Sequence, residues 1–384
     1  MELSDALLSL VRPLEPGGTL DGARLERVST ELGLRLTFAD GPTRVHVEVF
    51  PAEPERPHAA RSARLLFAYR LGRGAGPVEP ARGQALCRAV AELARPNEDR
   101  VLDALAAEAA PGDDPRVREV RGGRLLEPAG TPDRPYFTLS PYVGCLIGCR
   151  FCYAQRRVGL VRRLRGLPDA PWGSYVDARV DAPERLREEL RDRPPHPIKL
   201  CPIVSDPYHA IERRLALTRG CLEVLRDAPA RPVFVLTRAR LVERDADILE
   251  AMPEARVGFS IPTADDAVRR FFEPRAASIP ARFEVLRALR RRGVRTFAIV
   301  QPPLPGDLTE LADGLAGAAG SVSLDVLRGE EGASALFDAH PEARDPAWQA
   351  ARVEALREAL RARGVPTWQG ELPGLAERGP PAVE

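Results

Sequence analysis

Three cysteines lie within eight residues of one another near the middle of the chain. Cys145, Cys149 and Cys152 form a C-x₃-C-x₂-C pattern, and Gly144 and Gly148 precede the first two. Glycine lets the backbone curl closely around a bound group, which a residue with a Cβ would hinder. A cubane iron–sulfur cluster normally takes four thiolates, so three from one loop would leave one iron open to a small ligand. The pattern predicts a [4Fe–4S] cluster whose free iron can do chemistry.

The simpler alternatives are a structural zinc site and three unrelated core thiols. Structural zinc normally takes four protein ligands, and no fourth cysteine or histidine lies near the loop in sequence, although Cys201 or His209 could approach in space. The close spacing favours iron. Cys87 and Cys221 fall in helical patterns, where we interpret them as buried thiols of the core.

The composition is that of a folded protein in a reducing compartment. Hydrophobic residues make up 44% and charged residues 29% of 384 positions, which suits about two globular domains. Six cysteines, three of them clustered, suit metal ligation better than a disulfide framework. The chain begins with acidic residues and has no apolar run of about 20 residues, so we expect a cytoplasmic protein with no membrane partner.

The first 115 residues predict a small α/β domain of unknown role. Its expected helices cover 4–11, 82–93 and 98–109, and its expected strands cover 34–39, 45–50 and 65–69. Residues 116–135 are rich in proline, glycine and charge, which indicates a linker.

From residue 136 onward, strand patterns alternate with amphipathic helical segments. The expected strands are 136–139, 198–204, 233–237, 257–261, 296–300 and 322–327. Six such units predict a partial (β/α)₆ TIM-type barrel over 136–375, followed by a tail at 376–384. The cysteine loop comes directly after the first strand, at the end where parallel barrels carry their chemistry.

Five stretches of this predicted barrel carry most of its distinctive motifs. They are the loop 140–154 with Phe151 before the last cysteine, Ser205-Asp206-Pro207-Tyr208 with Ile211-Glu212, Leu217-Thr218-Arg219, Leu236-Thr237-Arg238, and Glu273-Pro274-Arg275. Together they resemble the radical S-adenosylmethionine (SAM) superfamily, and more narrowly its spore photoproduct lyase-like branch, over roughly residues 120 to 310.

The resemblance implies a reaction and its partners. SAM would bind the open iron through its amino and carboxylate groups, take one electron, and split into methionine and a 5′-deoxyadenosyl radical that abstracts hydrogen from a substrate. A small electron donor such as flavodoxin or ferredoxin would supply the electron. The substrate is not readable from the sequence.

The same resemblance implies cofactor contacts for several residues. Tyr153 follows the last cysteine, where family members contact the adenine; simple packing is the alternative. Ser205 and Asp206 end the second barrel strand and resemble positions that hydrogen-bond the methionine or ribose part of SAM. Asp206 is also a suitable helix N-cap, and the two roles can coexist.

Three further polar residues end the next three strands. Arg238 stands where the branch usually has lysine, and its cation could pair with the SAM carboxylate. Ser260 and Gln301 are candidates for SAM or substrate contact, with solvation of the barrel rim as the alternative.

Cys201 is the candidate catalytic residue, as a hydrogen donor to the product. In the spore photoproduct lyase-like branch such a cysteine lies beside the Ser-Asp pair, but Cys201 is four residues before Ser205. On a strand that separation is roughly 13 Å. It favours a core thiol over a hydrogen donor.

An arginine run without acidic residues follows the cysteine loop at positions 156, 157, 162, 163 and 165. It could receive a phosphate backbone, but a solvated helical face is the favoured interpretation. The 56 basic and 55 acidic residues nearly balance, so global charge does not favour nucleic acid. Repair of a DNA photoproduct and a non-catalytic electron-transfer or structural Fe–S protein stay open as alternatives.

Overall fold

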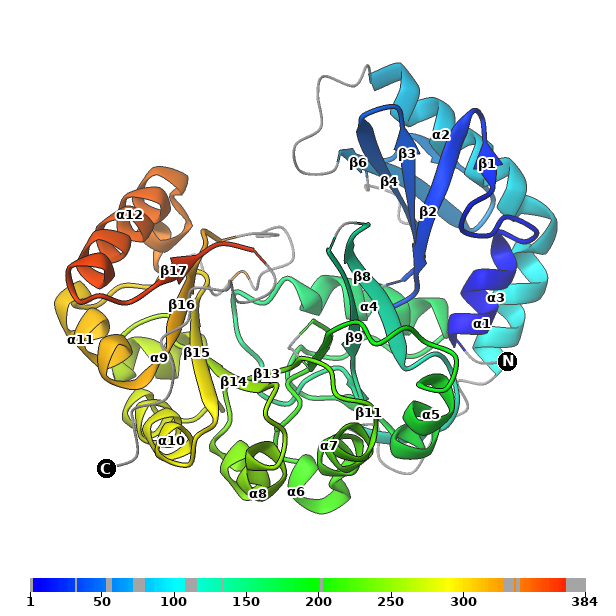
Figure 1. Ribbon diagram of the computed structural model, residues 1–384. Helices are drawn as coiled ribbons and strands as arrows, with labels where there is room; N and C mark the ends of the chain where they lie inside the picture. The colour runs from blue at the N-terminus through cyan, green and yellow to red at the C-terminus, as the bar shows by residue number, and fades with distance from the viewer. Residues whose placement is uncertain are drawn as a thin grey trace. The chain divides into compact units, whose positions relative to one another are not determined.

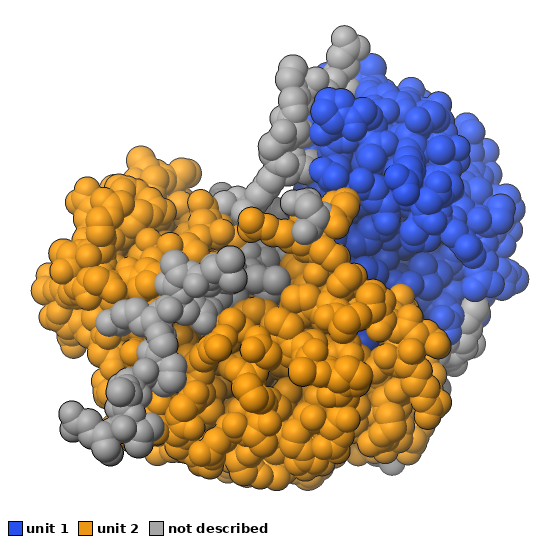
Figure 2. Space-filling view, in the orientation of Figure 1, with its two compact units in different colours: residues 1–115, 122–129, 157–170 blue, residues 116–121, 130–156, 171–384 orange. Residues whose placement is uncertain are grey.

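The computed structural model describes residues 3–31, 33–52, 57–71, 80–107, 116–132, 134–200, 203–327, 335 and 339–370. The chain divides into two compact units (Figures 1 and 2). Unit 1 comprises 1–115, 122–129 and 157–170, and unit 2 comprises 116–121, 130–156 and 171–384. The first unit is therefore built from three separate stretches of chain, whereas the sequence suggests one.

Unit 1 contains an antiparallel sheet in the order β1-β2-β3-β4-β6-β5. The strands are β1 (Thr19–Leu20), β2 (Ala23–Ser29), β3 (Arg35–Asp40), β4 (Thr43–Pro51), β5 (Ala60–Arg61) and β6 (Leu65–Leu71). The helices are α1 (Leu3–Leu10), α2 (Pro80–Ala94) and α3 (Glu98–Ala107), with the 3₁₀ turn η1 (Arg95–Asn97) between the last two. Alternate residues of β4, among them Val45 and Val47, join α2 and α3 in one apolar core.

A buried carboxylate organises a group of arginines in unit 1. Glu48 of β4 pairs with Arg35 at 2.8 Å, with Arg70 at 2.6 Å and with Arg157 at 3.0 Å. Burial alone would raise the pKa of Glu48, but the three arginines lower it to about 2. Arg157 belongs to the predicted arginine run, and Arg162 of that run is buried. Arg162 is therefore packed inside the protein, and Arg157 is partly buried in an ion pair rather than fully solvated.

Unit 2 contains most of a curled sheet in the order β17-β16-β15-β14-β13-β12-β9-β8, whose last strand belongs to unit 1 up to residue 129 and to unit 2 from residue 130. Its strands are β8 (Leu126–Thr131), β9 (Arg134–Leu139), β12 (Ile198–Leu200), β13 (Val233–Thr237), β14 (Ala255–Ser260), β15 (Arg295–Val300), β16 (Ser321–Leu324) and β17 (Thr367–Trp368). From β9 to β17 every neighbouring pair is parallel. Figure 1 shows helices on the outside of this sheet. The predicted α/β fold with a partial TIM-type barrel is confirmed.

The helices from α4 onward occupy connections between strands, and α4 belongs to unit 1 from residue 157. They are α4 (Ala154–Leu164), α5 (Ala182–Glu189), α6 (Glu212–Leu215), α7 (Leu217–Asp227), α8 (Ala246–Glu250), α9 (Asp266–Phe272), α10 (Ile279–Arg291), α11 (Leu308–Ala318) and α12 (Pro346–Ala362), with 3₁₀ turns η2 (Arg240–Asp245) and η5 (Pro341–Arg344). Asp265, Ser278, Asp307 and Asp345 cap four of them, because each side chain accepts a hydrogen bond from a first-turn N–H.

The predicted linker is more ordered than its composition suggests. It contains β7 (Val117–Val120), β8 and the start of β9, and β7 pairs with β11 (Val176–Arg179) beside β10 (Tyr142–Val143). Gly122 and Gly123 both have positive φ, so the glycines mark a turn between strands rather than a flexible tether. The expected tail at 376–384 and the candidate Cys201 lie outside the described residues.

The remaining cysteines behave as the sequence predicts. Cys87 on α2 and Cys221 on α7 are free thiols with no exposed surface. Within the part of the chain that the structure describes, no helix is both long and apolar enough to cross a bilayer.

Candidate cluster-binding site

The cysteine loop begins where β9 ends, at the carboxyl edge of the curled sheet. Gly144 and Gly148 have φ values of +87° and +72°, which residues with a Cβ rarely adopt. A Cβ on Gly148 would lie 2.7 Å from Arg275 Nη2 and 3.2 Å from the Cα of Gly173. The loop is therefore compact because its glycines allow close contact with neighbouring segments.

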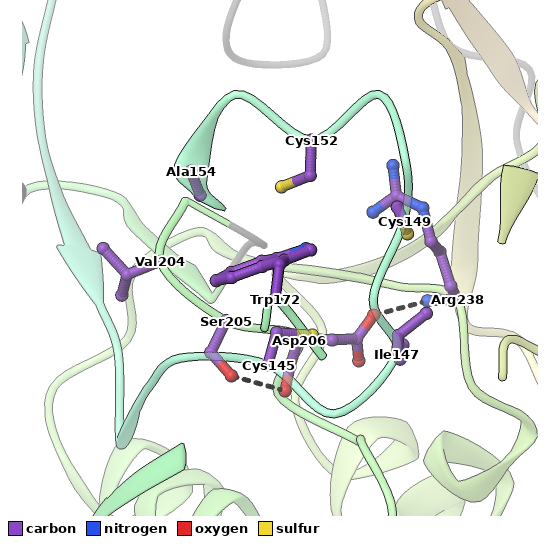
Figure 3. Close-up of a pocket in the computed structure, with 10 residues that line it drawn as sticks. All are labelled: Cys145, Ile147, Cys149, Cys152, Ala154, Trp172, Val204, Ser205, Asp206 and Arg238. Carbon is purple, nitrogen blue, oxygen red and sulfur yellow. Dashed lines mark hydrogen bonds between the residues drawn. The ribbon is translucent and has the colours of Figure 1, made fainter. Parts of the chain in front are cut away.

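All three cysteines of the loop line one pocket (Figure 3). Its other lining residues are Ile147, Ala154, Trp172, Val204, Ser205, Asp206 and Arg238. The pocket holds about 280 Å³ of empty space, part of it open to solvent. Cys145 and Cys149 are buried, Cys152 is partly buried, and all three are free thiols in an apolar cluster that includes Phe151 and Phe272.

Burial and the charge of Arg238 act in opposite directions on the pKa values of Cys149 and Cys152. Burial raises the pKa of Cys145 to about 12 and raises the pKa values of Cys149 and Cys152 above their ordinary value. The positive charge of Arg238 opposes this shift for Cys149 and Cys152. Metal ligation requires thiolates, so positive charge within the pocket is needed to hold them ionised.

The described side chains do not form a ready site for a single zinc ion. Zinc–sulfur bonds of about 2.3 Å would bring the thiolates to about 4 Å from one another, and no three described His, Cys, Asp or Glu side chains are arranged to hold one metal ion. A four-iron cluster spans a greater distance between its thiolates. His209, the possible fourth zinc ligand, instead packs edge-on against Tyr142 with 4.6 Å between ring centroids.

The pocket also contains a buried polar atom without a partner. The Nε1 atom of Trp172 is buried and has no hydrogen-bond partner among the described residues. A buried indole N–H usually finds an acceptor. An acceptor on a bound group would satisfy it, so the pocket fits an occupant with electron-rich atoms.

Asp206 ties the ends of two neighbouring strands together beside the pocket. Its Oδ1 accepts hydrogen bonds from Tyr208 N at 2.9 Å and from Thr237 Oγ1 at 2.6 Å, and its Oδ2 accepts from Arg238 N at 2.8 Å. Burial raises the pKa of this carboxyl, and the three hydrogen bonds oppose the shift. Asp206 therefore fixes the backbone that presents Ser205 and Arg238 to the pocket.

Arg238 connects the pocket to a buried ion-pair chain. Its Nε donates to Glu273 Oε1 at 2.7 Å, and the other Glu273 oxygen accepts from Arg282. Arg282 also donates to the Ser260 carbonyl at 2.6 Å. Figure 3 shows the Arg238 guanidinium beside Cys149. Arg238 thus provides a cation at the pocket, and Glu273 holds its Nε in place.

Arg275, two residues after Glu273, joins the cysteine loop to the segment that carries Trp172. Its Nε donates to the Leu146 carbonyl within the loop, and its Nη2 donates to the Gly173 carbonyl at 2.6 Å. We call these two hydrogen bonds the Arg275 bridge. The bridge explains why the Glu273-Pro274-Arg275 motif lies far from the cysteines in sequence yet belongs to the site.

The other motif residues form a buried network near these strand ends. Glu212 accepts hydrogen bonds from Tyr142 Oη, from Thr218 N at 3.0 Å and from Arg244 Nη2 at 2.6 Å. Tyr208 Oη donates to Asp245 at 3.0 Å, and both carboxylates are fully buried. These residues support the loop after β12 rather than contact the pocket.

The remaining predicted site residues lie outside the set that lines the pocket. Tyr153 is exposed. Ser260 ends β14, and its buried Oγ has no hydrogen-bond partner among the described residues. Gln301, just after β15, donates from Nε2 to the Val326 carbonyl at 3.3 Å. The structure thus brings Ser205, Asp206 and Arg238 to the cysteines, and SAM contact by all six residues stays a prediction.

Comparison with known protein families agrees with this geometry. Residues 139–310 match the family model described as the Radical SAM superfamily. The match begins at the end of β9 and includes the cysteine loop, the strand ends of β12 to β15 and the Arg275 bridge. Residues 139–310 are thus the part of the chain that matches a radical SAM domain.

Individual relatives share this radical SAM domain at low identity. An uncharacterised protein of Methanocaldococcus jannaschii is 26% identical over 192 residues, which are 49% of this chain and 68% of that protein. A protein of Pseudomonas phage M6, named a radical SAM Nalpha-GlyT isomerase, is 26% identical over 185 residues, or 47% of this chain and 36% of that protein. The chain thus matches about a third of the phage protein's length.

Solved structures resemble a larger part of the chain. A spore photoproduct lyase complexed with a dinucleoside spore photoproduct has a TM-score of 0.48 and 17% identity, and the match covers 66% of this chain and 82% of that one. Members of the radical SAM superfamily typically bind a [4Fe–4S] cluster and SAM.

Proposed function

We propose that the chain is a radical SAM enzyme that holds a [4Fe–4S] cluster on Cys145, Cys149 and Cys152. The observation that carries the proposal is the convergence of three free thiols from one loop on a single pocket, at the carboxyl edge of a parallel sheet. When bound, a cluster with one iron free of protein ligands supplies the electron that splits SAM into methionine and a 5′-deoxyadenosyl radical.

The residues around the thiols have separate tasks in this proposal. Arg238 lies at the pocket with its Nε fixed by Glu273, so its cation can attract the SAM carboxylate. Ser205 offers a hydroxyl at the pocket wall, and Asp206 positions both. The apolar neighbours of the cysteines limit the polar surface around the thiols, which would help to protect a reactive radical from side reactions. A flavodoxin- or ferredoxin-like donor would supply the electron in the cell.

The decisive experiment is anaerobic reconstitution with iron and sulfide, followed by dithionite and SAM. We expect 5′-deoxyadenosine from the wild-type protein, and none from Cys149→Ala, which removes one of three ligands. Cys221→Ala is the matched control, because that thiol is buried in α7. It should retain product formation.

Two outcomes would contradict the proposal. A fully loaded cluster that forms no 5′-deoxyadenosine, with several reductants tried, would favour an electron-transfer or structural role. Equal product from wild type and Cys149→Ala would show that the loop does not carry the reaction.

A further inference from the structure

Among the described side chains that line the cysteine pocket, Trp172 contributes the one buried N–H donor without a hydrogen-bond partner. Its Nε1 has no hydrogen-bond partner among the described residues, and its indole lines the pocket with Cys145, Cys149 and Cys152. Figure 3 shows the indole ring among the three cysteine side chains in that view. A buried donor without a hydrogen bond costs about 1–3 kcal/mol of stability, so an acceptor on a bound group would stabilise this N–H.

The protein itself offers few oxygen acceptors at this position. Both carboxylate oxygens of Asp206 already accept hydrogen bonds from neighbouring residues. The hydroxyl of Ser205 donates to the Asp206 carbonyl at 3.4 Å. The other lining side chains are aliphatic, cationic or thiols. None of these lining oxygens hydrogen-bonds the indole N–H, and a cluster on the three cysteines would bring sulfur acceptors to this pocket.

Trp172 is held in place relative to the cysteine loop. Its ring packs edge-on against Tyr175, with ring centroids 6.1 Å apart and an interplanar angle of 79°. The Arg275 bridge holds the next residue, Gly173, to the loop. A Cβ on Gly173 would lie 2.8 Å from the Cα of Gly148, so the two backbones are in close contact. The donor is consequently fixed before any group binds.

We propose that the Trp172 N–H donates a hydrogen bond to a sulfur atom of the [4Fe–4S] cluster and thereby raises the reduction potential of that cluster. The inference rests on the cluster assignment of the proposed function. A hydrogen bond to sulfur stabilises the more electron-rich, reduced form. In this proposal Trp172 makes the cluster easier to reduce and takes no part in bond cleavage.

The test is a redox titration of the reconstituted protein without SAM, followed by electron paramagnetic resonance. Trp172→Phe keeps an aromatic ring and removes the N–H. We expect its midpoint potential to be more negative than that of wild type. At a fixed solution potential the ratio of reduced to oxidised cluster should fall roughly fivefold, the equivalent of one hydrogen bond.

Trp368→Phe is the matched control for the substitution itself. Trp368 lies in the same unit, and its Nε1 already donates to Ser321 Oγ at 3.2 Å. This variant should have the wild-type potential. An unchanged potential in Trp172→Phe at full iron content would overturn the inference. An unchanged potential together with weaker SAM binding would also overturn it, and would indicate that the Trp172 N–H donates to SAM.

A second measurement does not depend on how the variant folds. Wild-type protein with ¹⁵N-labelled tryptophan should show hyperfine coupling between an indole nitrogen and the reduced cluster, and its absence would contradict the hydrogen bond. Neither measurement requires SAM cleavage. A loaded cluster that makes no 5′-deoxyadenosine would therefore contradict the proposed function alone, whereas a wild-type chain that assembles no cluster would contradict both.

Discussion

At the scale of single residues, Glu273 is one carboxylate that pairs with two arginines. It is fully buried and lies between Arg238, at the pocket, and Arg282, which is also fully buried. Removing one member of a buried ion pair leaves an uncompensated charge, which costs more than the pair contributes. Glu273 therefore matters for stability as well as for the position of Arg238.

We expect Glu273→Gln to lower the free energy of unfolding by about 3 kcal/mol. Urea denaturation followed by circular dichroism measures the loss. The matched control is Glu250→Gln, because Glu250 pairs with Arg292 at 2.7 Å with both side chains nearly half exposed. That exposed pair should cost less than about 1 kcal/mol. Similar losses in the two variants would contradict the importance given to burial.

Some residues of the pocket could be predicted from the sequence and others could not. The three cysteines could be predicted because their spacing along the chain reflects their geometry in a single loop. Trp172 could not, because it lies 20 residues beyond Cys152 and reaches the pocket only through a tertiary contact. The sequence offers only a tryptophan between proline and glycine as a signal. The role of Asp206 as a tie between strand ends was likewise hidden, since it depends on Thr237 and Arg238.

At the scale of elements, the cysteine loop keeps its shape through the Arg275 bridge. The loop has little regular structure of its own, apart from the two residues of β10. Its contact with the segment that holds Gly173 is so close that no side chain fits between the two backbones. Support of metal ligands by neighbouring hydrogen bonds commonly changes metal affinity 10- to 100-fold.

Arg275→Ala should release the cluster at least about tenfold faster in a chelator challenge, because both hydrogen bonds of the bridge are lost. Loss of the iron–sulfur absorbance after addition of a chelator gives the rate. Arg270→Ala is the control, because Arg270 is two-thirds exposed and pairs with Asp266 at the surface. If both variants lose iron at the wild-type rate, the loop does not depend on the bridge.

The elements themselves were largely predictable, and the exceptions have physical causes. Six barrel strands were expected from their apolar runs, and the one at 233–237 has the predicted bounds. β2 was not expected, because a register shift between Leu25 and Arg27 interrupts its alternation of buried and exposed residues. β17 was not expected either, because two residues are too few for a pattern. Only pairing with β16 makes it a strand.

At the scale of the whole molecule, buried histidines make stability depend on pH. Burial lowers the pKa of His209 to about 3, and neither ring nitrogen has a hydrogen-bond partner among the described residues. In the unfolded chain this imidazole takes up a proton below pH 6.5. The unfolded state then binds more protons than the folded state, so stability falls as the pH decreases from about 6.5 toward 3.

His209→Phe should therefore flatten the pH dependence of unfolding. We expect the difference in unfolding free energy between pH 7.5 and pH 5 to shrink by roughly 2 kcal/mol relative to wild type. Urea denaturation at the two pH values measures it. His58→Gln, a substitution of an exposed histidine, should leave the dependence as in wild type. An unchanged slope in His209→Phe would show that this histidine is not kept neutral.

The three-part composition of unit 1 has a consequence for how the protein is made. Its last stretch, 157–170, follows the cysteine loop and carries Arg157, the partner of Glu48. A ribosome must therefore translate the entire cysteine loop before the first unit can close its ion-pair cluster. Neither unit exists as one uninterrupted stretch of the gene, so recombination could not exchange one of them without cutting into the other.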